Sequence, residues 1–174
     1  MRLFFAVTPD EGARQSLMAF AADVASVTGG RAPRAENLHL TVAFLGEVDQ
    51  QRVADVEAIG AASATVSGPF VITFDRVGLF RDAGVAWIAP SETPAGLLRI
   101  VAALRNALQA KGMRVDHRDF RPHVTLARRC TRPLSGVAAP HIQWQVEALA
   151  LIASQTLPEG PLYRELAAWR LAEE

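Results

Sequence analysis

Residues 39–42 read His-Leu-Thr-Val, and residues 123–126 read His-Val-Thr-Leu. Both tetrapeptides have the pattern His–apolar–Thr–apolar, and they lie about half the chain apart. Side chains alternate between the two faces of a strand, so His and Thr share one face while the two apolar residues share the other. The repeat therefore predicts two related lobes, each contributing one strand of this kind.

The apolar positions of the repeat predict which way each strand faces. Leu40 and Val42 are expected to face the core in the first copy, and Val124 and Leu126 in the second. The imidazole and hydroxyl of each copy then point outward together. Two such strands across a groove would present two imidazoles and two hydroxyls to one ligand.

The flanking sequence predicts alternating strands and helices. A proline with acids in the first turn starts a helix near Asp10, and Gly29 ends it. Asp49 is expected to cap a second helix, Thr93 begins a third that ends near Gly112, and residues 81–84 form a hairpin turn. Strands are expected at residues 2–8, 37–45, 69–80, 85–89, 123–128 and 142–154, and from residue 163.

The order of these elements mixes helices, strands and a hairpin, which favours the α+β class over a doubly wound parallel sheet. No linker or low-complexity segment divides the chain. We therefore expect residues 1–174 to form a single domain made of two lobes. At 174 residues the chain is long enough to bury a core without disulfides.

Composition limits the classes of function. The net charge is zero, with 18 basic and 18 acidic residues, which is unlike a protein that tracks along a polyanion. One short stretch is nevertheless rich in arginine, which suits recognition of one or two phosphates or simply forms a solvated face. These arginines are Arg114, Arg118, Arg121, Arg128, Arg129 and Arg132.

Cysteine usage and hydropathy predict where the protein works. The single cysteine, Cys130, excludes an intramolecular disulfide and fits a reducing compartment. No signal peptide is recognisable, and no segment approaches the roughly 18 apolar residues of a membrane span. We expect a cytoplasmic protein that does not bind a membrane and works as a monomer.

The repeated tetrapeptide suits phosphodiester chemistry. Imidazole has an ordinary pKa of about 6.5, so one ring can donate a proton while the other accepts one near neutral pH. The hydroxyls of Thr41 and Thr125 can donate to phosphate oxygens. Exposed strand histidines are more often structural, and short patterns also recur by chance, so the residues alone leave both interpretations open. His39 and His123 without nearby Cys, Asp or Glu ligands make a poor metal site, and neither a metal nor a cofactor is expected.

Four segments together resemble one known family. They are MRLFFAV at the N-terminus, NLHLTVAFLGEV around the first tetrapeptide, FRPHVTLAR around the second and the late GPLYREL. This set is similar to the 2H phosphoesterase superfamily, and within it to the bacterial RNA 2′,3′-cyclic phosphodiesterases, which are also described as 2′–5′ RNA ligases. The resemblance runs from residue 1 to about residue 166.

The resemblance implies a bilobal α+β fold, with two pseudo-symmetric lobes of antiparallel sheet flanked by helices around a central groove. It also implies metal-free hydrolysis of an RNA-terminal 2′,3′-cyclic phosphate to a 2′-phosphate, with possible reversal as 2′–5′ ligation. His39 then resembles the proton donor to the leaving oxygen and His123 the proton acceptor that activates water. Thr41 and Thr125 resemble phosphate-binding residues.

One position departs from the family. Relatives often carry lysine after the first tetrapeptide (HLTLKFLG), whereas this chain has Ala43. Arg128, two residues beyond the second tetrapeptide, is a candidate phosphate ligand or a surface arginine paired with an acid.

Aromatic residues are candidates for contacts to a nucleobase. Phe44, Phe80 and Trp87 are candidates for stacking on a base, although aromatic residues in strands are more often part of the core. Tyr163 matches a late tyrosine of the family and is expected either in the groove or buried.

Two other functions fit the same residues. A non-enzymatic module would use the groove only to hold RNA ends or a nucleotide. Binding alone does not need two titratable imidazoles. A 2H enzyme acting on a small cyclic nucleotide would keep the chemistry and change the substrate.

Overall fold

One antiparallel sheet organises the chain in the computed structural model, which describes residues 1–158 and 160–172. Within these residues the sheet has seven strands in the order β4-β5-β6-β2-β1-β8-β9, and β3 and β7 form a second, two-stranded sheet. The strands are β1 Arg2–Val7, β2 Leu40–Glu47, β3 Phe70–Phe74, β4 Arg76–Phe80, β5 Val85–Ala89, β6 Val124–Ala127, β7 Ile142–Val146, β8 Ala148–Leu157 and β9 Gly160–Arg170. The helices are α1 Glu11–Thr28, α2 Val53–Ser63 and α3 Ala95–Ala110, with 3₁₀ turns η1 Ala35–Asn37, η2 Gln50–Arg52 and η3 Ala64–Val66.

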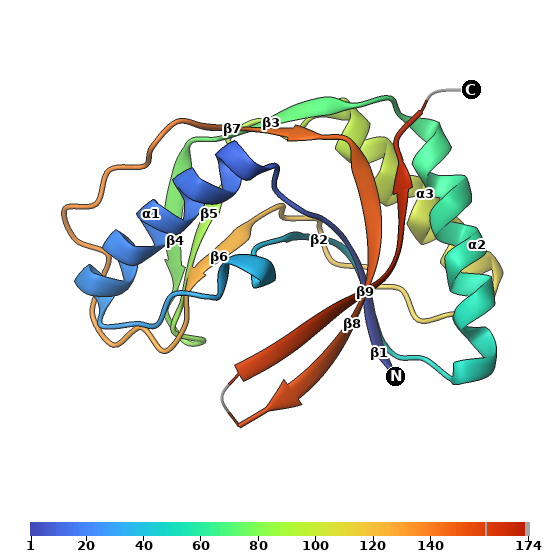
Figure 1. Cartoon of the computed structure of the whole chain (residues 1–174), viewed down its shortest axis with the longest axis horizontal. Coiled ribbons are helices and arrows are strands. Elements are labelled where there is room, and N and C mark those ends of the chain that lie inside the picture. Colours follow the sequence, from blue (N-terminus) through green and yellow to red (C-terminus); the bar gives the residue numbers. More distant parts are fainter. Residues whose placement is uncertain (159, 173–174) are drawn as a thin grey trace.

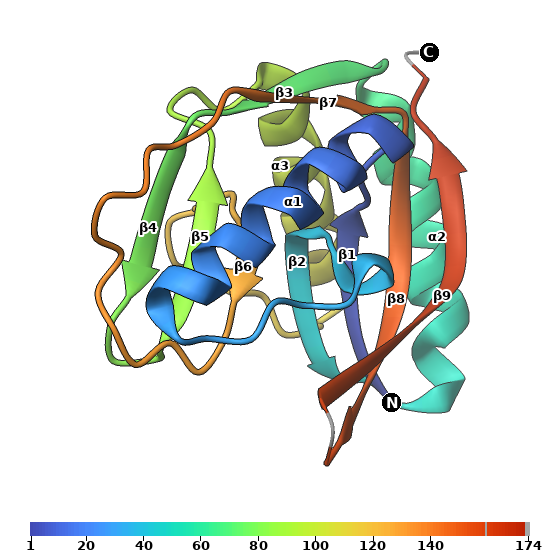
Figure 2. The same ribbon diagram turned by 60° about the vertical axis from the view of Figure 1, so that its left-hand side comes forward.

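The two lobes meet in the middle of the large sheet. Strand β2 is followed outward by β1, β8 and β9 in one lobe, and strand β6 is followed outward by β5 and β4 in the other. The strands β2 and β6 are antiparallel and share a single register pair, Leu40 with Val124. Figures 1 and 2 show β4, β5 and β6 on one side of the molecule and β1, β8 and β9 on the other.

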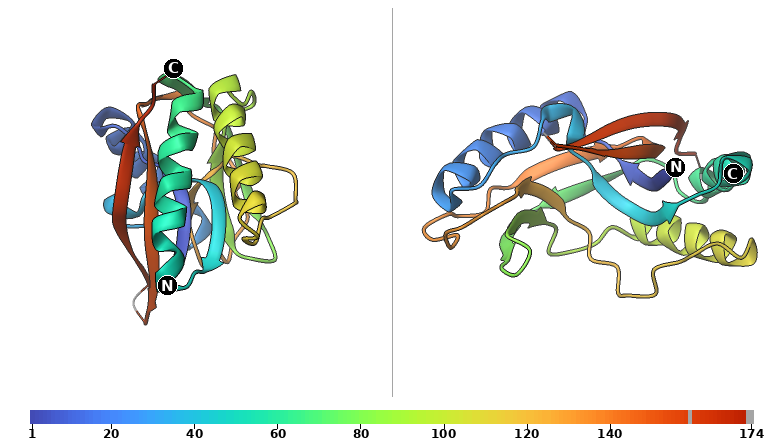
Figure 3. Two further views of the ribbon diagram at one scale, coloured as in Figure 1. Left: turned by 90° about the vertical axis from the view of Figure 1, so that its right-hand side faces the viewer. Right: turned by 90° about the horizontal axis from the view of Figure 1, so that it is seen from below.

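The apolar residues of both tetrapeptides lie in the main core. Leu40, Val42, Val124 and Leu126 are all buried, as the strand alternation predicts. Helix α1 packs on β6 and β7, and α3 packs on β2 and α2. The helices lie at opposite ends of the molecule, with α1 at one end and α2 and α3 at the other (Figure 3). The predicted α+β class is confirmed.

Two of the predicted strands are each divided into two strands in the structure. The strand predicted at residues 69–80 breaks at Asp75, and the one at residues 142–154 breaks after Val146. In both cases the first half lies outside the large sheet, and these two halves, β3 and β7, pair with each other. Between them Trp144 stacks on Phe74, with ring centroids 5.5 Å apart. The apolar positions shift from residues 70, 72 and 74 to residues 77 and 79 across the first break, and alternation gives way to a continuous apolar run after Glu147 at the second. Each change of pattern marks the place where the chain changes sheets.

Four predicted boundaries are also corrected. Residue 37 ends the 3₁₀ turn η1, so the strand predicted at 37–45 begins only at Leu40. The strand predicted at residues 123–128, β6, begins at Val124. The strand predicted from residue 163, β9, begins at residue 160. Asp49 precedes the 3₁₀ turn η2 without a side-chain cap, and α2 begins at Val53. Each histidine therefore lies one residue before its strand.

The remaining elements agree with the prediction. Asp10 caps α1 by accepting a hydrogen bond from the Ala13 amide at 2.8 Å. Gly29 ends the helix in the left-handed conformation, with φ of 68°. Among the described residues, no helix is long and apolar enough to cross a membrane.

The shared core makes a thermodynamic prediction. Leu40→Ala is expected to lower the free energy of unfolding by about 2–5 kcal/mol, because it removes a fully buried side chain at the junction of the lobes. Tryptophan fluorescence and far-UV circular dichroism are expected to report one shared urea transition, since the core spans both lobes. Leu98→Ala is the matched control; Leu98 is 48% exposed, so the change should stay within about 0.5 kcal/mol. Separate transitions for the two lobes would contradict the prediction.

Candidate active site

Each tetrapeptide histidine is held by a backbone carbonyl two residues earlier. The Nδ1 atom of His39 donates to the Asn37 carbonyl oxygen at 2.7 Å, and that of His123 donates to the Arg121 carbonyl oxygen at 2.8 Å. A carbonyl oxygen can only accept, so Nδ1 carries the proton in both rings. The Nε2 atom of each ring is therefore the one available for proton transfer.

The register between β2 and β6 places each histidine beside the threonine of the other lobe. Leu40 pairs with Val124 in antiparallel register. The flanking positions therefore face one another, His39 with Thr125 and Thr41 with His123. Both pairs lie on the face opposite the core, because Leu40 and Val124 point into it. Neither half of the site is complete within one lobe.

Two cavities lie beside this junction, and each contains one of these mixed pairs. The first, which we name the arginine cavity, has a volume of about 480 Å³ and contains His39 and Thr125. The second, the phenylalanine cavity, has a volume of about 890 Å³ and contains Thr41 and His123. The site is thus a pair of adjacent half-sites that repeat the relationship between the two lobes.

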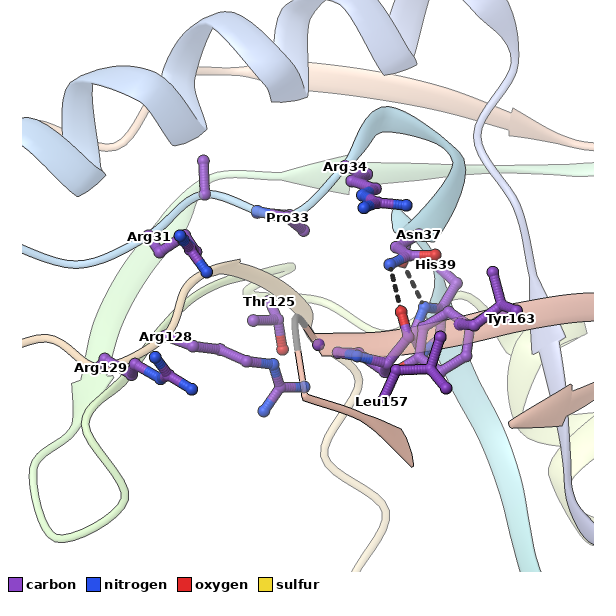
Figure 4. A pocket seen from close by; sticks show the side chains of 14 residues that line it. Arg31, Pro33, Arg34, Asn37, His39, Thr125, Arg128, Arg129, Leu157 and Tyr163 are labelled. Carbon is purple, nitrogen blue, oxygen red and sulfur yellow. Dashed lines mark hydrogen bonds between the residues drawn. The ribbon is translucent and has the colours of Figure 1, made fainter. Parts of the chain in front are cut away.

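The arginine cavity carries a concentrated positive charge. No aspartate or glutamate is among the described residues that line it. Four arginines are: Arg31, Arg34, Arg128 and Arg129. Within the described residues, none of these guanidiniums takes part in an ion pair or a side-chain hydrogen bond. Figure 4 shows Arg31 and Arg129 on one side and His39 with Tyr163 on the other, with Thr125 and the Arg128 side chain between them.

Aromatic rings surround each histidine in a similar way. His39 lies against Phe4 and Tyr163, with ring centroids 4.9 and 5.0 Å away, and the Tyr163 contact is edge-on. His123 makes an edge-on contact with Phe80 at 5.5 Å, and Phe80 packs on Trp87 at 5.5 Å. These rings restrict both imidazoles to a narrow range of orientations.

The wall behind His39 is joined to the β8–β9 hairpin. The Asn37 side-chain amide donates to the Pro161 carbonyl oxygen at 3.0 Å, which ties the 3₁₀ turn η1 to the start of β9. The hairpin brings Tyr163 against His39, and Leu157 and Leu162 also line the cavity. A segment more than a hundred residues away in sequence thus completes the cavity.

The two histidines differ in their surroundings. Burial lowers the pKa of the His39 imidazole below its ordinary value, while the hydrogen bond to the Asn37 carbonyl acts in the opposite direction. The positive charges of Arg128 and His123 lower this pKa further. At neutral pH the His39 ring is therefore neutral in the absence of a ligand.

The phenylalanine cavity is larger and closer to electroneutral. It contains three arginines and two aspartates, and Arg118 is held by hydrogen bonds to Asp116 at 2.6–3.1 Å. These bonds hold the pKa of the Asp116 carboxyl far below its usual range, so the pair stays ionised. Phe44 and Phe80 line the cavity and are 43% and 39% exposed.

Comparison with known proteins identifies the family. The family model described as "LigT like Phosphoesterase" matches residues 7–87 and 88–163, and each match contains one tetrapeptide. The chain belongs to the LigT-like phosphoesterase family. The double match across the two halves agrees with the internal repeat.

Curated relatives of this LigT-like phosphoesterase are named after the same activity. The RNA 2′,3′-cyclic phosphodiesterase of Thermus thermophilus is 33% identical over 100% of this chain and 92% of the relative. The protein of that name from Archaeoglobus fulgidus is 32% identical over 95% of this chain and 98% of the relative. Their names describe those proteins.

Solved structures of the family share the fold. The crystal structure of the Thermus thermophilus protein TT0787 superposes with a TM-score of 0.86 at 31% identity, covering 100% of both chains. Escherichia coli LigT in complex with 3′-AMP superposes with a TM-score of 0.84 at 28% identity, covering 99% of this chain and 98% of LigT. The expected bilobal 2H phosphoesterase fold is confirmed.

The structure gathers the residues predicted from sequence into the two half-sites. Arg128 and Tyr163 line the arginine cavity, and Phe44 and Phe80 line the phenylalanine cavity. Trp87 lines neither cavity but supports Phe80 from the neighbouring strand. A Cβ at its cross-strand partner Gly78 would collide with the Trp87 indole, so that glycine leaves room for the ring.

Several residues of the site escaped sequence reasoning. Phe4 appears in sequence only as part of a buried strand, and Asn37 as the start of another. Arg31 follows a predicted helix and reaches the site because its backbone pairs with that of Arg128. Ala43 lines the phenylalanine cavity and adds no charge there.

The electrostatics of this LigT-like phosphoesterase predict a coupled titration. Arg128→Gln is expected to raise the pKa of His39 toward 6.5, because it removes a nearby positive charge. NMR titration of the imidazole protons measures this pKa, and a His39→Gln spectrum assigns the signal. Arg170→Gln, an equal change of charge on an exposed residue of β9, should leave the pKa unchanged. A His39 pKa that stays fixed in Arg128→Gln would contradict the prediction.

Proposed function

We propose that this LigT-like phosphoesterase hydrolyses the 2′,3′-cyclic phosphate at the end of an RNA to a 2′-phosphate. The observation that carries the proposal is the cross-lobe arrangement of His39 and His123, each with Nε2 available and each beside a threonine of the other lobe. Several relatives bear the name of this activity, four of them at 30% identity or more over at least 92% of this chain. The chain is thus a cyclic phosphodiesterase.

Two proton transfers accompany the reaction. A water molecule attacks phosphorus and gives its proton to Nε2 of His123. The bond between phosphorus and the 3′ oxygen breaks, and the departing 3′ oxygen takes a proton from Nε2 of His39. The product carries a 2′-phosphate and a free 3′-hydroxyl. Exchange with solvent then restores the proton on His39 and removes the one on His123.

The neighbouring side chains stabilise the charge that builds up on the phosphate. The hydroxyls of Thr41 and Thr125 can each donate to a non-bridging oxygen, one from each half-site. Arg128 supplies a full positive charge near His39. These groups provide acid, base and anion stabilisation from the side chains themselves, which supports a mechanism without a metal.

Substrate binding prepares His39 for its role as proton donor. Its pKa is lowered in the free protein, so the ring is mostly neutral there. A phosphate anion placed between His39 and Arg128 offsets the arginine charge and favours the imidazolium form. The substrate therefore raises the pKa of the group that must protonate its leaving oxygen.

Ligation at a 2′,3′-cyclic phosphate belongs to the same proposal. A 5′-hydroxyl in the position of the attacking water would give its proton to His123 while the departing 3′ oxygen takes one from His39, which forms a 2′–5′ linkage. In the reverse step the 3′-hydroxyl attacks, the 5′ oxygen leaves and the two histidines exchange roles. The phenylalanine cavity beside His123 offers exposed rings on which an incoming nucleoside can stack. We propose that the protein acts as a cytoplasmic monomer, with a terminal cyclic phosphate of RNA as its substrate.

The histidine pair makes the first functional prediction. His39→Ala and His123→Ala are each expected to lower the rate of hydrolysis by about 10²–10⁴-fold, because each removes one general acid or base. Hydrolysis of an oligoribonucleotide ending in a 2′,3′-cyclic phosphate measures the rate, and circular dichroism checks the fold. His141→Ala is the matched control, since His141 is exposed and lines neither cavity. Turnover at the parental rate in either active-site variant would refute the pair.

Product and metal dependence complete this test. The product is expected to be the 2′-phosphate, and full activity is expected in EDTA. A 3′-phosphate product would overturn the division of labour between the two histidines. Tight binding of the cyclic phosphate without any product would favour a binding module instead.

The pH dependence of kcat/KM tests which histidine is the acid, because burial lowers the pKa of His39 in the free protein. With His39 as the donor, kcat/KM should fall as pH rises through the pKa of His39 in the free enzyme, below 6.5. In Arg128→Gln this descending limb should move to higher pH, because the His39 pKa rises. A profile that instead rises through the pKa of His39 would make His39 the base. The measurement is kcat/KM from about pH 4 to about pH 9 at constant ionic strength.

A further inference from the structure

The arginine cavity holds more positive charge than the reacting phosphate needs. A 2′,3′-cyclic phosphate is a monoanion, and Arg128 beside Thr125 and His39 already faces it. Arg31 and Arg129 extend the charge to the side of the cavity away from His39 (Figure 4).

The backbone holds two of these arginines at directly opposite positions. Arg31 and Arg128 form an isolated antiparallel bridge, with hydrogen bonds of 2.8 and 3.0 Å between their backbone groups. Side chains at paired positions share one face, and like charges placed opposite one another destabilise a strand pair. Among the described residues no carboxylate forms an ion pair with either arginine. The bridge therefore concentrates charge at a cost in stability.

Arg129 adds a second unfavourable feature at the same place. It is the only non-glycine residue of the described chain with positive φ, at 58°. A left-handed conformation is unfavourable for a residue with a Cβ, and strained residues of this kind cluster at ligand sites. The turn keeps the Arg129 side chain in the cavity lining beside Arg128.

From these observations we infer that Arg31 and Arg129 bind a second phosphate, the one attached to the 5′ oxygen of the terminal nucleotide. In RNA this is the last internucleotide phosphodiester. The cyclic phosphate and the 5′ phosphate lie at opposite ends of one ribose, so the nucleoside spans the cavity from Thr125 to the arginine cluster. This subsite rests on the proposed function, and it makes the enzyme prefer RNA ends over cyclic mononucleosides.

The other cavity does not offer the same binding. The phenylalanine cavity has aspartates beside its arginines, and Asp116 already holds Arg118. Its exposed rings suit an uncharged nucleoside better than a phosphate. The direction of the RNA chain is thus set by charge, with its 5′ side over the arginine cavity.

A pair of substrates that differ by one phosphate tests the inference. Adenosine 2′,3′-cyclic phosphate has no 5′ phosphate, whereas its 5′-phosphorylated form has one. We expect kcat/KM for the 5′-phosphorylated form to be about 10- to 100-fold higher, as for a charge-assisted contact. Arg31→Gln with Arg129→Gln should remove most of this advantage. Arg170→Gln, which makes the same change of charge outside both cavities, should keep it.

Binding measurements separate this inference from the proposed function. Calorimetry compares adenosine 3′-phosphate with adenosine 3′,5′-bisphosphate, and we expect the bisphosphate to bind at least about tenfold more tightly, with greater sensitivity to salt. The Arg31→Gln, Arg129→Gln variant should bind the two ligands about equally. If neither cyclic substrate is hydrolysed, the proposed function is wrong, and the calorimetry still tests the phosphate subsite independently. Equal affinities in the parental protein, or an advantage that survives in the variant, would overturn the inference.

Discussion

The pairing of Leu40 with Val124 is the constraint on which the rest of the site depends. These residues point into the core and fix the register between the lobes, and the register in turn sets each histidine beside the other lobe's threonine. A slip of one residue would turn the histidines into the core and the apolar side chains into the groove. The core residues and the two histidine–threonine pairs thus lie on opposite faces of the same two strands, so one register fixes both.

Near-symmetry of the backbone does not produce symmetry of function. Both imidazoles are oriented by a carbonyl two residues earlier, so the local geometry is nearly the same. The difference comes from the surroundings, since His39 is enclosed by Phe4, Tyr163 and the arginine cavity, whereas His123 faces the more neutral phenylalanine cavity. Acid–base catalysis needs two groups in different protonation states, and a phosphate bound between His39 and Arg128 would distinguish the two rings by favouring the imidazolium form of His39.

Sequence predicted the parts of the molecule that follow from local periodicity. The alternation around residues 40 and 124 gave the buried and the outward faces correctly, and the repeat gave the two lobes. The apolar positions change phase across Asp75 and Arg76, which is a local sign of the break, but the pairing of β3 with β7 in a separate sheet depends on the tertiary fold and was missed. The pairing of Arg31 with Arg128 joins segments about a hundred residues apart, and the contact of Phe4 with His39 depends on strand order. Such contacts are set by the tertiary fold, and no local pattern records them.

The arginine cavity shows how stability and binding oppose each other in this fold. The like charges of Arg31 and Arg128 and the left-handed backbone of Arg129 both lower the stability of the folded protein. An anion bound there would offset the repulsion between the guanidiniums, which favours binding. The catalytic phosphate alone has one charge to offer, and the unfavourable arrangement extends beyond its reach. The excess charge is therefore best explained by a ligand that carries its phosphates in series, as an RNA chain does.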